Sequence, residues 1–109
     1  MNTVLFVCTG NSCRSPMAAL IAAARVPEAL LGRVVFASAG TAAFDGMGAA
    51  QNAIEVLAEI GIELSDHRTR LLTLEMVDDA DVVVTMTEQH RSEVFGLVPG
   101  SAGKVIVLG

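Results

Sequence analysis

The stretch Thr3-Val4-Leu5-Phe6-Val7-Cys8-Thr9-Gly10-Asn11-Ser12-Cys13-Arg14-Ser15-Pro16-Met17 decides the fold. Its opening run, Thr3–Val7, is rich in β-branched and aromatic residues and predicts a strand that is buried on both faces. Ser15 and Pro16 then predict a helix start, because serine is a preferred N-cap and proline loses no hydrogen bond at the first helical position. A strand, a polar loop and a helix in this order begin a βαβ unit.

Outside this stretch, strands and helices continue to alternate. The sequence predicts further strands over Arg33–Ser38, Asp81–Met86 and Lys104–Leu108. It predicts helices over Met17–Arg25, Gly46–Ile60, Leu71–Asp79 and Glu88–Phe95, with Gly61 as a left-handed cap of the second. We therefore expect an α/β fold with a four-stranded parallel sheet that carries helices on both faces, in one domain over residues 1–109.

The composition excludes several classes of partner. Of the 109 residues, 52% are hydrophobic and 17% are charged, which gives ample material for one core. Seven Lys and Arg against twelve Asp and Glu give a net charge of -5, the wrong sign for neutralising the phosphates of nucleic acid or anionic lipid. No apolar stretch approaches the roughly 18 residues that span a membrane, and no basic export signal precedes the first strand. We expect a cytoplasmic protein that binds neither nucleic acid nor membrane.

The loop Cys8–Ser15 holds both cysteines of the chain and lies beyond the carboxyl end of the first strand, where parallel sheets bind ligands. A Cys8 thiolate at a helix N-terminus is stabilised by free backbone N–H groups and by the helix dipole. Successive amides of residues 9–15 can surround three phosphoryl oxygens, and Gly10 and Asn11 tolerate the left-handed backbone that this needs. The planar fork of Arg14 can hold two oxygens. The pattern predicts an oxyanion-binding loop with a cysteine nucleophile.

The chain resembles the low-molecular-weight protein tyrosine phosphatases, a family that includes bacterial protein arginine phosphatases and thioredoxin-coupled arsenate reductases. The opening Val4–Ala18 carries the resemblance most strongly. Ser38-Ala39-Gly40-Thr41, Asp66-His67-Arg68 and Ala80–His90 resemble the segments around the family's later elements, so the resemblance runs through the whole chain. It implies a sheet in the order 2-1-3-4.

The resemblance also implies a role for each residue of the loop. Cys8 would be the nucleophile, Arg14 the clamp on phosphate and transition state, and Ser15 the donor that helps the Cys8 sulfur leave. The phosphate-binding residues would be Thr9, Gly10, Asn11, Ser12, Cys13, Arg14 and Ser15. Asn11, Ser38 and His67 would form a hydrogen-bonded set that holds the loop in shape. Cys13 would form a reversible disulfide with Cys8, although the sequence alone fits a small apolar helix-start residue equally.

The implied function is hydrolysis of phosphotyrosine or phosphoarginine on proteins through a phosphocysteine intermediate, inhibited by inorganic phosphate or vanadate. No metal or organic cofactor is needed, and His67 and His90 lack metal-ligand spacing with the cysteines. His90 is expected to be an ordinary polar residue of a helix. At the position of Ser12, phosphotyrosine members carry a bulky aliphatic residue and arginine phosphatases carry Thr. Ser12 is nearer the second case and favours phosphoarginine slightly.

In one respect the chain departs from the family. Family members carry a catalytic Asp in an Asp-Pro loop beyond the fourth strand, followed by a C-terminal helix, and this sequence has neither. None of its aspartates matches that motif; they are Asp45, Asp66, Asp78, Asp79 and Asp81. The alternative function is therefore a phosphate- or phosphoprotein-binding module with weak turnover. Arsenate reductase ranks last, because Cys13 is the only cysteine left to relay a disulfide. The missing helix predicts an uncovered apolar face and self-association through it.

Overall fold

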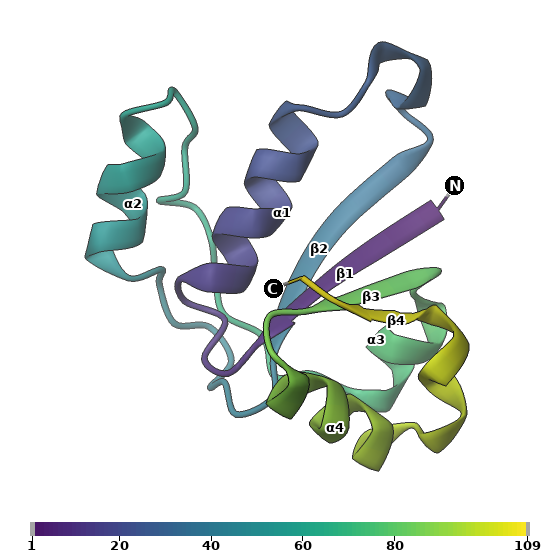
Figure 1. Ribbon diagram of the computed structural model, residues 1–109. Helices are drawn as coiled ribbons and strands as arrows, with labels where there is room; N and C mark the ends of the chain where they lie inside the picture. The colour runs from purple at the N-terminus through teal and green to yellow at the C-terminus, as the bar shows by residue number, and fades with distance from the viewer. Residues whose placement is uncertain (1, 109) are drawn as a thin grey trace.

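Four parallel strands form the centre of the computed structural model, which describes residues 2–108. They are β1 (Asn2–Cys8), β2 (Val34–Gly40), β3 (Val82–Thr85) and β4 (Val105–Val107), in the order β2-β1-β3-β4 (Figure 1). The predicted strand order is confirmed. Met1 and Gly109, the ends of the predicted domain, lie outside the described residues. In the register, Cys8 pairs with Gly40 and Val7 with Thr85, so the loop that follows β1 begins between the ends of two neighbouring strands.

Alternation along β1 decides which helix covers which face of the sheet. Leu5 and Val7 belong to a core that includes residues of α3 (Leu74–Asp79) and α4 (Glu88–Leu97). Phe6 points to the other face and packs with Ala19 of α1 (Arg14–Ala24). The helices therefore lie on both faces, as predicted (Figure 1).

Helix α2 (Gln51–Ala58) packs on α1 rather than on the sheet. Its buried Ala53 and Leu57 form a separate cluster with Leu64, against which Met17 and Leu20 pack. Two 3-10 helices complete the elements, η1 (Glu28–Leu30) and η2 (Pro99–Lys104). Gly61 ends this region with a φ of 78°, the predicted left-handed cap.

Three helix starts differ from the sequence prediction. Helix α3 begins at Leu74, not Leu71, because Thr73 is its N-cap and accepts from the N–H of Met76. The N-cap of α1 is Cys13, not Ser15, and Ser15 lies inside the first turn because its hydroxyl contacts the Cys8 sulfur instead of capping the backbone. Helix α2 begins at Gln51, not Gly46. The residues before it are held by cross-chain contacts instead: Gly48 forms a bridge with Arg68, and the N–H of Met47 donates to the hydroxyl of Thr69.

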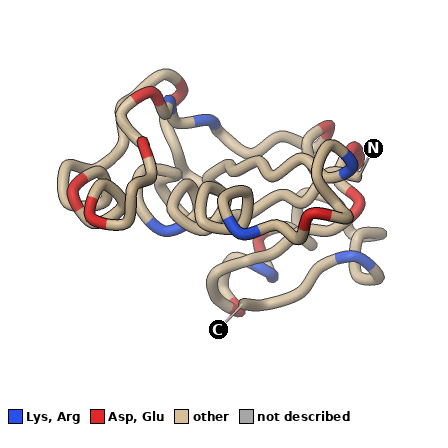
Figure 2. The backbone as a smooth tube through the Cα atoms, turned by 90° about the horizontal axis from the view of Figure 1, so that it is seen from above, with Lys and Arg blue, Asp and Glu red and all other residues tan. Residues whose placement is uncertain are grey.

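The charged residues do not gather around the loop that follows β1. Figure 2 shows acidic positions at both ends of the molecule, around α2 and at the opposite end near the N-terminus, while the basic positions are spread along the chain. Within residues 2–108, no helix is both long and apolar enough to cross a bilayer.

One side of α1 leaves apolar surface open. A groove beside this helix is lined mainly by Phe6, Met17, Ile21, Met86 and Leu108, and we call it the apolar groove. Ile106 of the edge strand β4 pairs in register with Val84, which faces α1, and it is 55% exposed. The uncovered apolar face that the sequence predicts beside the first helix is therefore present.

Candidate active site

The loop of residues 8–15, which we call the phosphate loop, turns its carbonyl groups outward. The carbonyls of Cys8 and Thr9 accept from the N–H groups of Thr41 and Ala42, each at 2.9 Å. Those of Ser12 and Cys13 accept from Ala50 and Met17 at 2.8 and 3.1 Å. By contrast, the N–H groups of residues 12–15 donate to no protein acceptor among residues 2–108. The loop thus presents free donors at its centre, the arrangement that binds an anion.

The Cys8 sulfur lies at the base of this loop and is buried, with 3% of the residue exposed. It is 2.9 Å from Ser15 Oγ, and it accepts from the N–H of Asn11 at 3.3 Å. The sulfur therefore lies against a serine hydroxyl and a backbone N–H at the base of the loop.

A chain of hydrogen bonds fixes Ser15 for this contact. The N–H of Arg70 donates to Asn11 Oδ1 at 2.8 Å, and Asn11 Nδ2 donates to Ser15 Oγ at 2.9 Å. Because Ser15 Oγ accepts this bond, its own hydrogen is available to the Cys8 sulfur at 2.9 Å or to the more distant Ala39 carbonyl at 3.5 Å. Asn11 is fully buried and has a φ of 55°, so the left-handed backbone predicted for Gly10 and Asn11 occurs at Asn11 alone.

His67 and Ser38 join the same network by different routes. His67 Nε2 lies 2.7 Å from the Asn11 carbonyl, which fixes that nitrogen as the protonated one. Ser38 contributes its main-chain carbonyl, which accepts from the guanidinium of Arg70 at 3.1 and 3.2 Å. The three residues predicted to hold the loop are therefore brought together, with Arg70, which the sequence analysis missed, as the link between Ser38 and Asn11.

Gly40 allows the phosphate loop to approach β2. A Cβ built at this position would collide with the carbonyl of Thr9 and would lie 2.9 Å from both the backbone nitrogen of Asn11 and the Cβ of Ala43. Only glycine fits against the loop at this distance.

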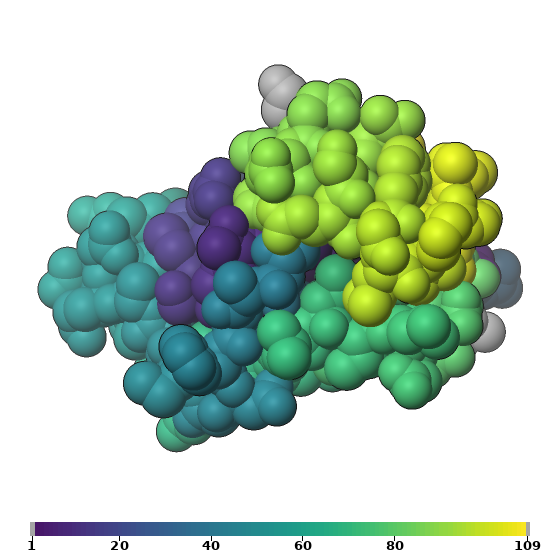
Figure 3. All heavy atoms as spheres, turned by 90° about the horizontal axis from the view of Figure 1, so that it is seen from below, coloured from purple at the N-terminus to yellow at the C-terminus, as the bar shows by residue number. Residues whose placement is uncertain are grey.

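Arg14 and Ser12 face the open side of the loop. Arg14 is the first residue of α1 and is exposed, and it forms no ion pair within residues 2–108. Its guanidinium is thus available to an anion above the Cys8 sulfur. Figure 3 shows the purple atoms of the phosphate loop at the surface between the blue-teal segment after β2 and the green atoms of α4.

A small pocket opens at the mouth of the loop, with Gly10 and Ser12 on one side and Phe44 and Met47 on the other. Phe44 is 81% exposed, and its segment is pinned by Thr69, whose hydroxyl bonds the Phe44 carbonyl and accepts from the N–H of Met47. The sequence analysis missed this wall. A lone aromatic residue in a Gly- and Ala-rich segment directly after a strand was the available signal.

His90 is not the ordinary polar helix residue that the sequence suggests. It is 2% exposed, and its ring contacts the hydroxyls of Thr9 and Thr87. Burial and the nearby Arg14 cation lower the pKa of His90, and the Glu93 carboxylate partly offsets them. The sequence could not reveal this, because Thr9 and His90 meet only in the folded chain.

Similarity to known proteins identifies the family of the chain. A family model described as low molecular weight phosphotyrosine protein phosphatase matches residues 3–109. The chain belongs to this family. It is 40% identical over 109 residues to the probable low molecular weight protein-tyrosine-phosphatase EpsP of Ralstonia solanacearum, covering 100% of this chain and 72% of EpsP.

Solved structures of the family extend the comparison to arginine phosphatases. YwlE arginine phosphatase from Geobacillus stearothermophilus matches with a TM-score of 0.88 at 38% identity, covering 98% of this chain and 66% of that one. A cysteine-to-serine mutant of YwlE arginine phosphatase with a phosphorylated active-site serine matches with a TM-score of 0.87 at 35% identity, covering 96% and 68%. The chain thus spans about two thirds of the length of these structures.

Within this family fold, four of the five aspartates lie toward the far end of β1 or are already engaged. Asp81 accepts from the N–H of Thr3 at 2.7 Å, at the end of β1 opposite the phosphate loop, and Asp78 and Asp79 end the helix that leads to Asp81. Asp45 accepts from the N–H of Leu71 at 2.8 Å. No aspartate within residues 2–108 is bonded to a residue of the phosphate loop.

The second cysteine is turned away from the first. Both thiols are free, and Cys13 Sγ lies 3.9 Å from the sulfur of Met17, on the side of the apolar groove. The Cys8–Cys13 disulfide implied by the family resemblance stays a prediction.

Proposed function

We propose that the chain is a cysteine-dependent phosphatase that acts on phosphorylated proteins. The Cys8 thiolate attacks phosphorus in line with the leaving group, so that an S–P bond forms while the P–O or P–N bond breaks. Arg14 and the free N–H groups of the phosphate loop stabilise the negative charge on the equatorial oxygens. Water then attacks phosphorus, the S–P bond breaks, and phosphate leaves.

Ser15 acts in the second step of this scheme. Its Oγ lies 2.9 Å from the Cys8 sulfur, and negative charge returns to that sulfur as the S–P bond breaks. This contact is the observation that carries the proposal. A purely structural cysteine would not need a serine hydroxyl held against its buried thiol at the centre of an anion-binding loop.

Trapping the intermediate tests the proposal. The protein would be mixed with an aryl phosphate, quenched in acid within milliseconds, digested and examined by mass spectrometry. We expect the peptide with Cys8 to gain one phosphoryl group, and Cys8→Ser to release no phosphate. Cys13→Ser serves as the matched cysteine control and should still form the adduct. A phosphorylated residue other than Cys8 would contradict the mechanism.

For the substrate, we propose phosphoarginine ahead of phosphotyrosine. Ser12 and Phe44 both line the mouth pocket, which offers a ring on which a planar guanidinium can stack and a hydroxyl that can accept from its N–H groups. Hydrolysis of phosphoarginine and phosphotyrosine peptides should be compared before and after Ser12→Ile. An unchanged preference in Ser12→Ile would contradict this assignment.

The second candidate is a phosphoprotein-binding module with weak turnover. The position of the aspartates favours it, since Asp81 is engaged with Thr3 at the far end of β1. Binding of a phosphopeptide with no release of phosphate over hours would identify this function. Inorganic phosphate and vanadate should compete for the loop in either case.

We also propose a cytoplasmic location and contact between copies of the chain. Both cysteines are free thiols, which suits a reducing compartment. The apolar groove offers a surface through which two copies can associate.

A further inference from the structure

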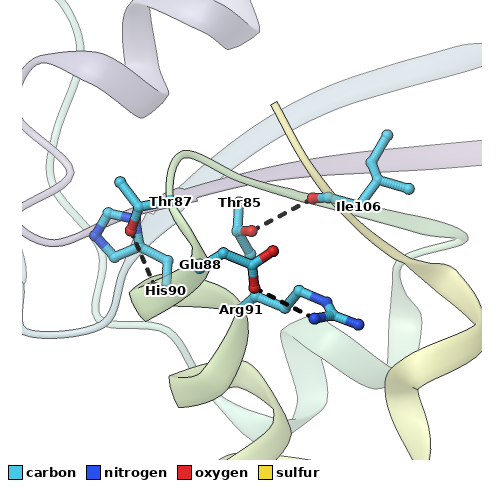
Figure 4. A network of polar contacts seen from close by, with 6 residues as sticks. All are labelled: Thr85, Thr87, Glu88, His90, Arg91 and Ile106. Carbon is cyan, nitrogen blue, oxygen red and sulfur yellow. Dashed lines mark hydrogen bonds and ion pairs between the residues drawn. The ribbon is translucent and has the colours of Figure 1, made fainter. Parts of the chain in front are cut away.

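The His90 ring joins helix α4 to the phosphate loop. Its Nδ1 lies 3.0 Å from Thr87 Oγ1, and its Nε2 lies 2.8 Å from Thr9 Oγ1. Thr87 is the N-cap of α4, and Thr9 is the residue that directly follows Cys8. Figure 4 shows His90 and Thr87 together at one side of α4, away from the Glu88–Arg91 ion pair.

The N-cap role of Thr87 favours one placement of the protons between Thr87, His90 and Thr9. Thr87 Oγ1 already accepts from the backbone N–H of His90 at 3.2 Å. Its own hydrogen can therefore go to Nδ1, which makes Nδ1 the acceptor and leaves the ring proton on Nε2. Nε2 then donates to Thr9 Oγ1. Since Thr9 Oγ1 accepts this bond, its hydroxyl hydrogen is free for another partner.

The residue that carries this hydroxyl hydrogen, Thr9, is exposed, although its neighbour Cys8 is buried. The charge around the ring supports the neutral form, because burial and Arg14 lower the pKa of His90 while Glu93 on the same helix acts in the opposite direction. In this arrangement the ring is neutral, since a protonated Nδ1 could not accept from Thr87.

We propose that His90 is a positioning residue of the active site, which holds Thr9 so that the Thr9 hydroxyl donates to an oxygen of the bound substrate. This inference rests on the proposed function and names one further polar contact for the same site. Removal of the ring should weaken substrate binding more than it slows the chemical step, because Cys8, Arg14 and Ser15 keep their own contacts.

Anion binding can be measured without turnover. Protection of Cys8 from iodoacetamide by inorganic phosphate or vanadate gives a dissociation constant. We expect His90→Leu and Thr9→Val each to raise this constant about 5- to 15-fold, the effect of one lost hydrogen bond. The double variant should be no worse than either single one, because both remove the same contact. With an aryl phosphate, KM should rise by a similar factor while kcat changes less than about twofold.

Two further variants separate positioning from general damage. His90→Gln can place an amide N–H near the Nε2 position and should recover most of the affinity. Thr73→Ala is the matched control for the cap: Thr73 caps α3 as Thr87 caps α4, each accepting from the N–H three residues on, but Thr73 has no contact with the loop. Thr87→Ala should weaken phosphate binding and Thr73→Ala should not.

Two results would overturn the inference. One is a wild-type dissociation constant in His90→Leu, and the other is full additivity of His90→Leu with Thr9→Val. Nitrogen NMR of the His90 ring reads the contact independently of activity: protonated Nε2 with bare Nδ1 at neutral pH supports the link, and the opposite tautomer excludes it. If the wild-type protein binds no anion and forms no phosphocysteine, the proposed function fails, and the ring spectrum still decides the His90 contact.

Discussion

The Ser15 hydroxyl contacts two side chains of the site in addition to the Ala39 carbonyl, and each side-chain contact has a distinct consequence. It accepts from Asn11 Nδ2 and faces the Cys8 sulfur, both at 2.9 Å. Ser15→Ala removes the donor to the departing thiolate and leaves the buried Asn11 amide without its acceptor.

We expect Ser15→Ala to slow release of phosphate from Cys8 by about 10- to 100-fold, since a hydrogen bond to a charged group contributes roughly 1.5–3 kcal/mol. Phosphocysteine should accumulate in a rapid-quench experiment with an aryl phosphate. Ser101→Ala is the control, because Ser101 is also buried but its hydroxyl bonds to nothing within residues 2–108. Equal steady-state levels of phosphocysteine in wild type and Ser15→Ala would contradict the assigned role.

Gly40 tests the packing behind the phosphate loop. In Gly40→Ala the new methyl group would press on the Thr9 carbonyl and on the Asn11 nitrogen, 2.9 Å away. We expect a loss of about 1–3 kcal/mol of stability and a clear loss of phosphate affinity. Gly96→Ala in helix α4 meets nothing within 4 Å and should stabilise the protein by roughly 0.5–1 kcal/mol. Thermal melts with and without phosphate measure both effects.

At this scale, the sequence predicts residues whose function is encoded in consecutive positions. The loop between a strand and a helix predicts Cys8 as nucleophile and Arg14 as anion clamp, and the family resemblance adds the roles of Asn11 and Ser15. The structure brings Cys8, Asn11 and Ser15 into contact. Phe44 and His90 could not be predicted, because their roles depend on which segments meet after the chain folds. The burial of His90 in particular contradicts its polar helical context.

Helix α4 is connected to the phosphate loop through a group whose charge depends on pH. Burial and Arg14 hold the pKa of His90 below its ordinary value of 6.5, against the opposing effect of Glu93. The unfolded chain therefore takes up a proton on this ring at a higher pH than the folded chain does. The stability contributed by the neutral ring is complete above pH 6.5 and is lost as the pH falls from 6.5 through the lowered pKa of the folded state.

We therefore expect the melting temperature of the wild-type protein to fall more between pH 7.5 and about 5 than that of His90→Gln, which has no ring to protonate. His67→Gln provides a comparison with the other histidine, for which the hydrogen bond to the Asn11 carbonyl does not require a neutral ring. Parallel pH profiles for wild type and His90→Gln would contradict this expectation.

Element type was predictable here, but element starts were not. Alternating patterns were enough to place the four strands and the four α-helices, and Gly61 marked the end of the second, whereas the 3-10 helices η1 and η2 were not predicted. The start of α1 was misplaced by the preference of serine for N-caps, since the Ser15 hydroxyl contacts the Cys8 sulfur instead. The start of α2 was misplaced because the Thr69 hydroxyl fixes the Met47 segment as an irregular wall of the mouth pocket.

On the scale of the whole molecule, the sheet is covered unequally. The side chains of α3 and α4 bury one face of the sheet, whereas the apolar groove stays open beside α1 on the other. Leu108 and Ile106, at 59% and 55% exposed, extend the apolar surface along the β4 edge. Two copies joined through this surface would remove it from water.

We expect concentration-dependent self-association in sedimentation velocity at micromolar concentrations. Ile106→Lys places a charge in the apolar surface and should weaken the association at least tenfold, roughly 1.4 kcal/mol. Leu74→Lys is a matched control on the other face, where Leu74 is 45% exposed. A chain that sediments as a monomer throughout, or an equal effect of both substitutions, would exclude the apolar groove as the contact surface.

The distribution of carboxylates over the molecule leads to a prediction about turnover. Acidic positions lie at both ends of the molecule (Figure 2). Asp78 and Asp79 end α3 and Asp81 directly precedes β3, where it bonds the N–H of Thr3 at the end of β1 opposite the phosphate loop. When a phosphoryl group passes to the Cys8 sulfur, the leaving group therefore receives no proton from any of these three carboxyl groups. General-acid catalysis commonly contributes about 100- to 10,000-fold, but only where the leaving group needs a proton.

The rate of this 109-residue chain should therefore depend steeply on the leaving group. We expect an aryl phosphate with an acidic phenol to react roughly 100-fold or more faster than an unactivated one, since a stable phenolate can leave unprotonated. The measurement is kcat/KM across a series of aryl phosphates of rising phenol pKa, with Cys8→Ser as the background. Formation of phosphocysteine should carry this dependence, because its breakdown is the same for every substrate once the phenol has left. Rates that do not vary with the phenol would show that a proton donor other than these three aspartates acts at the site.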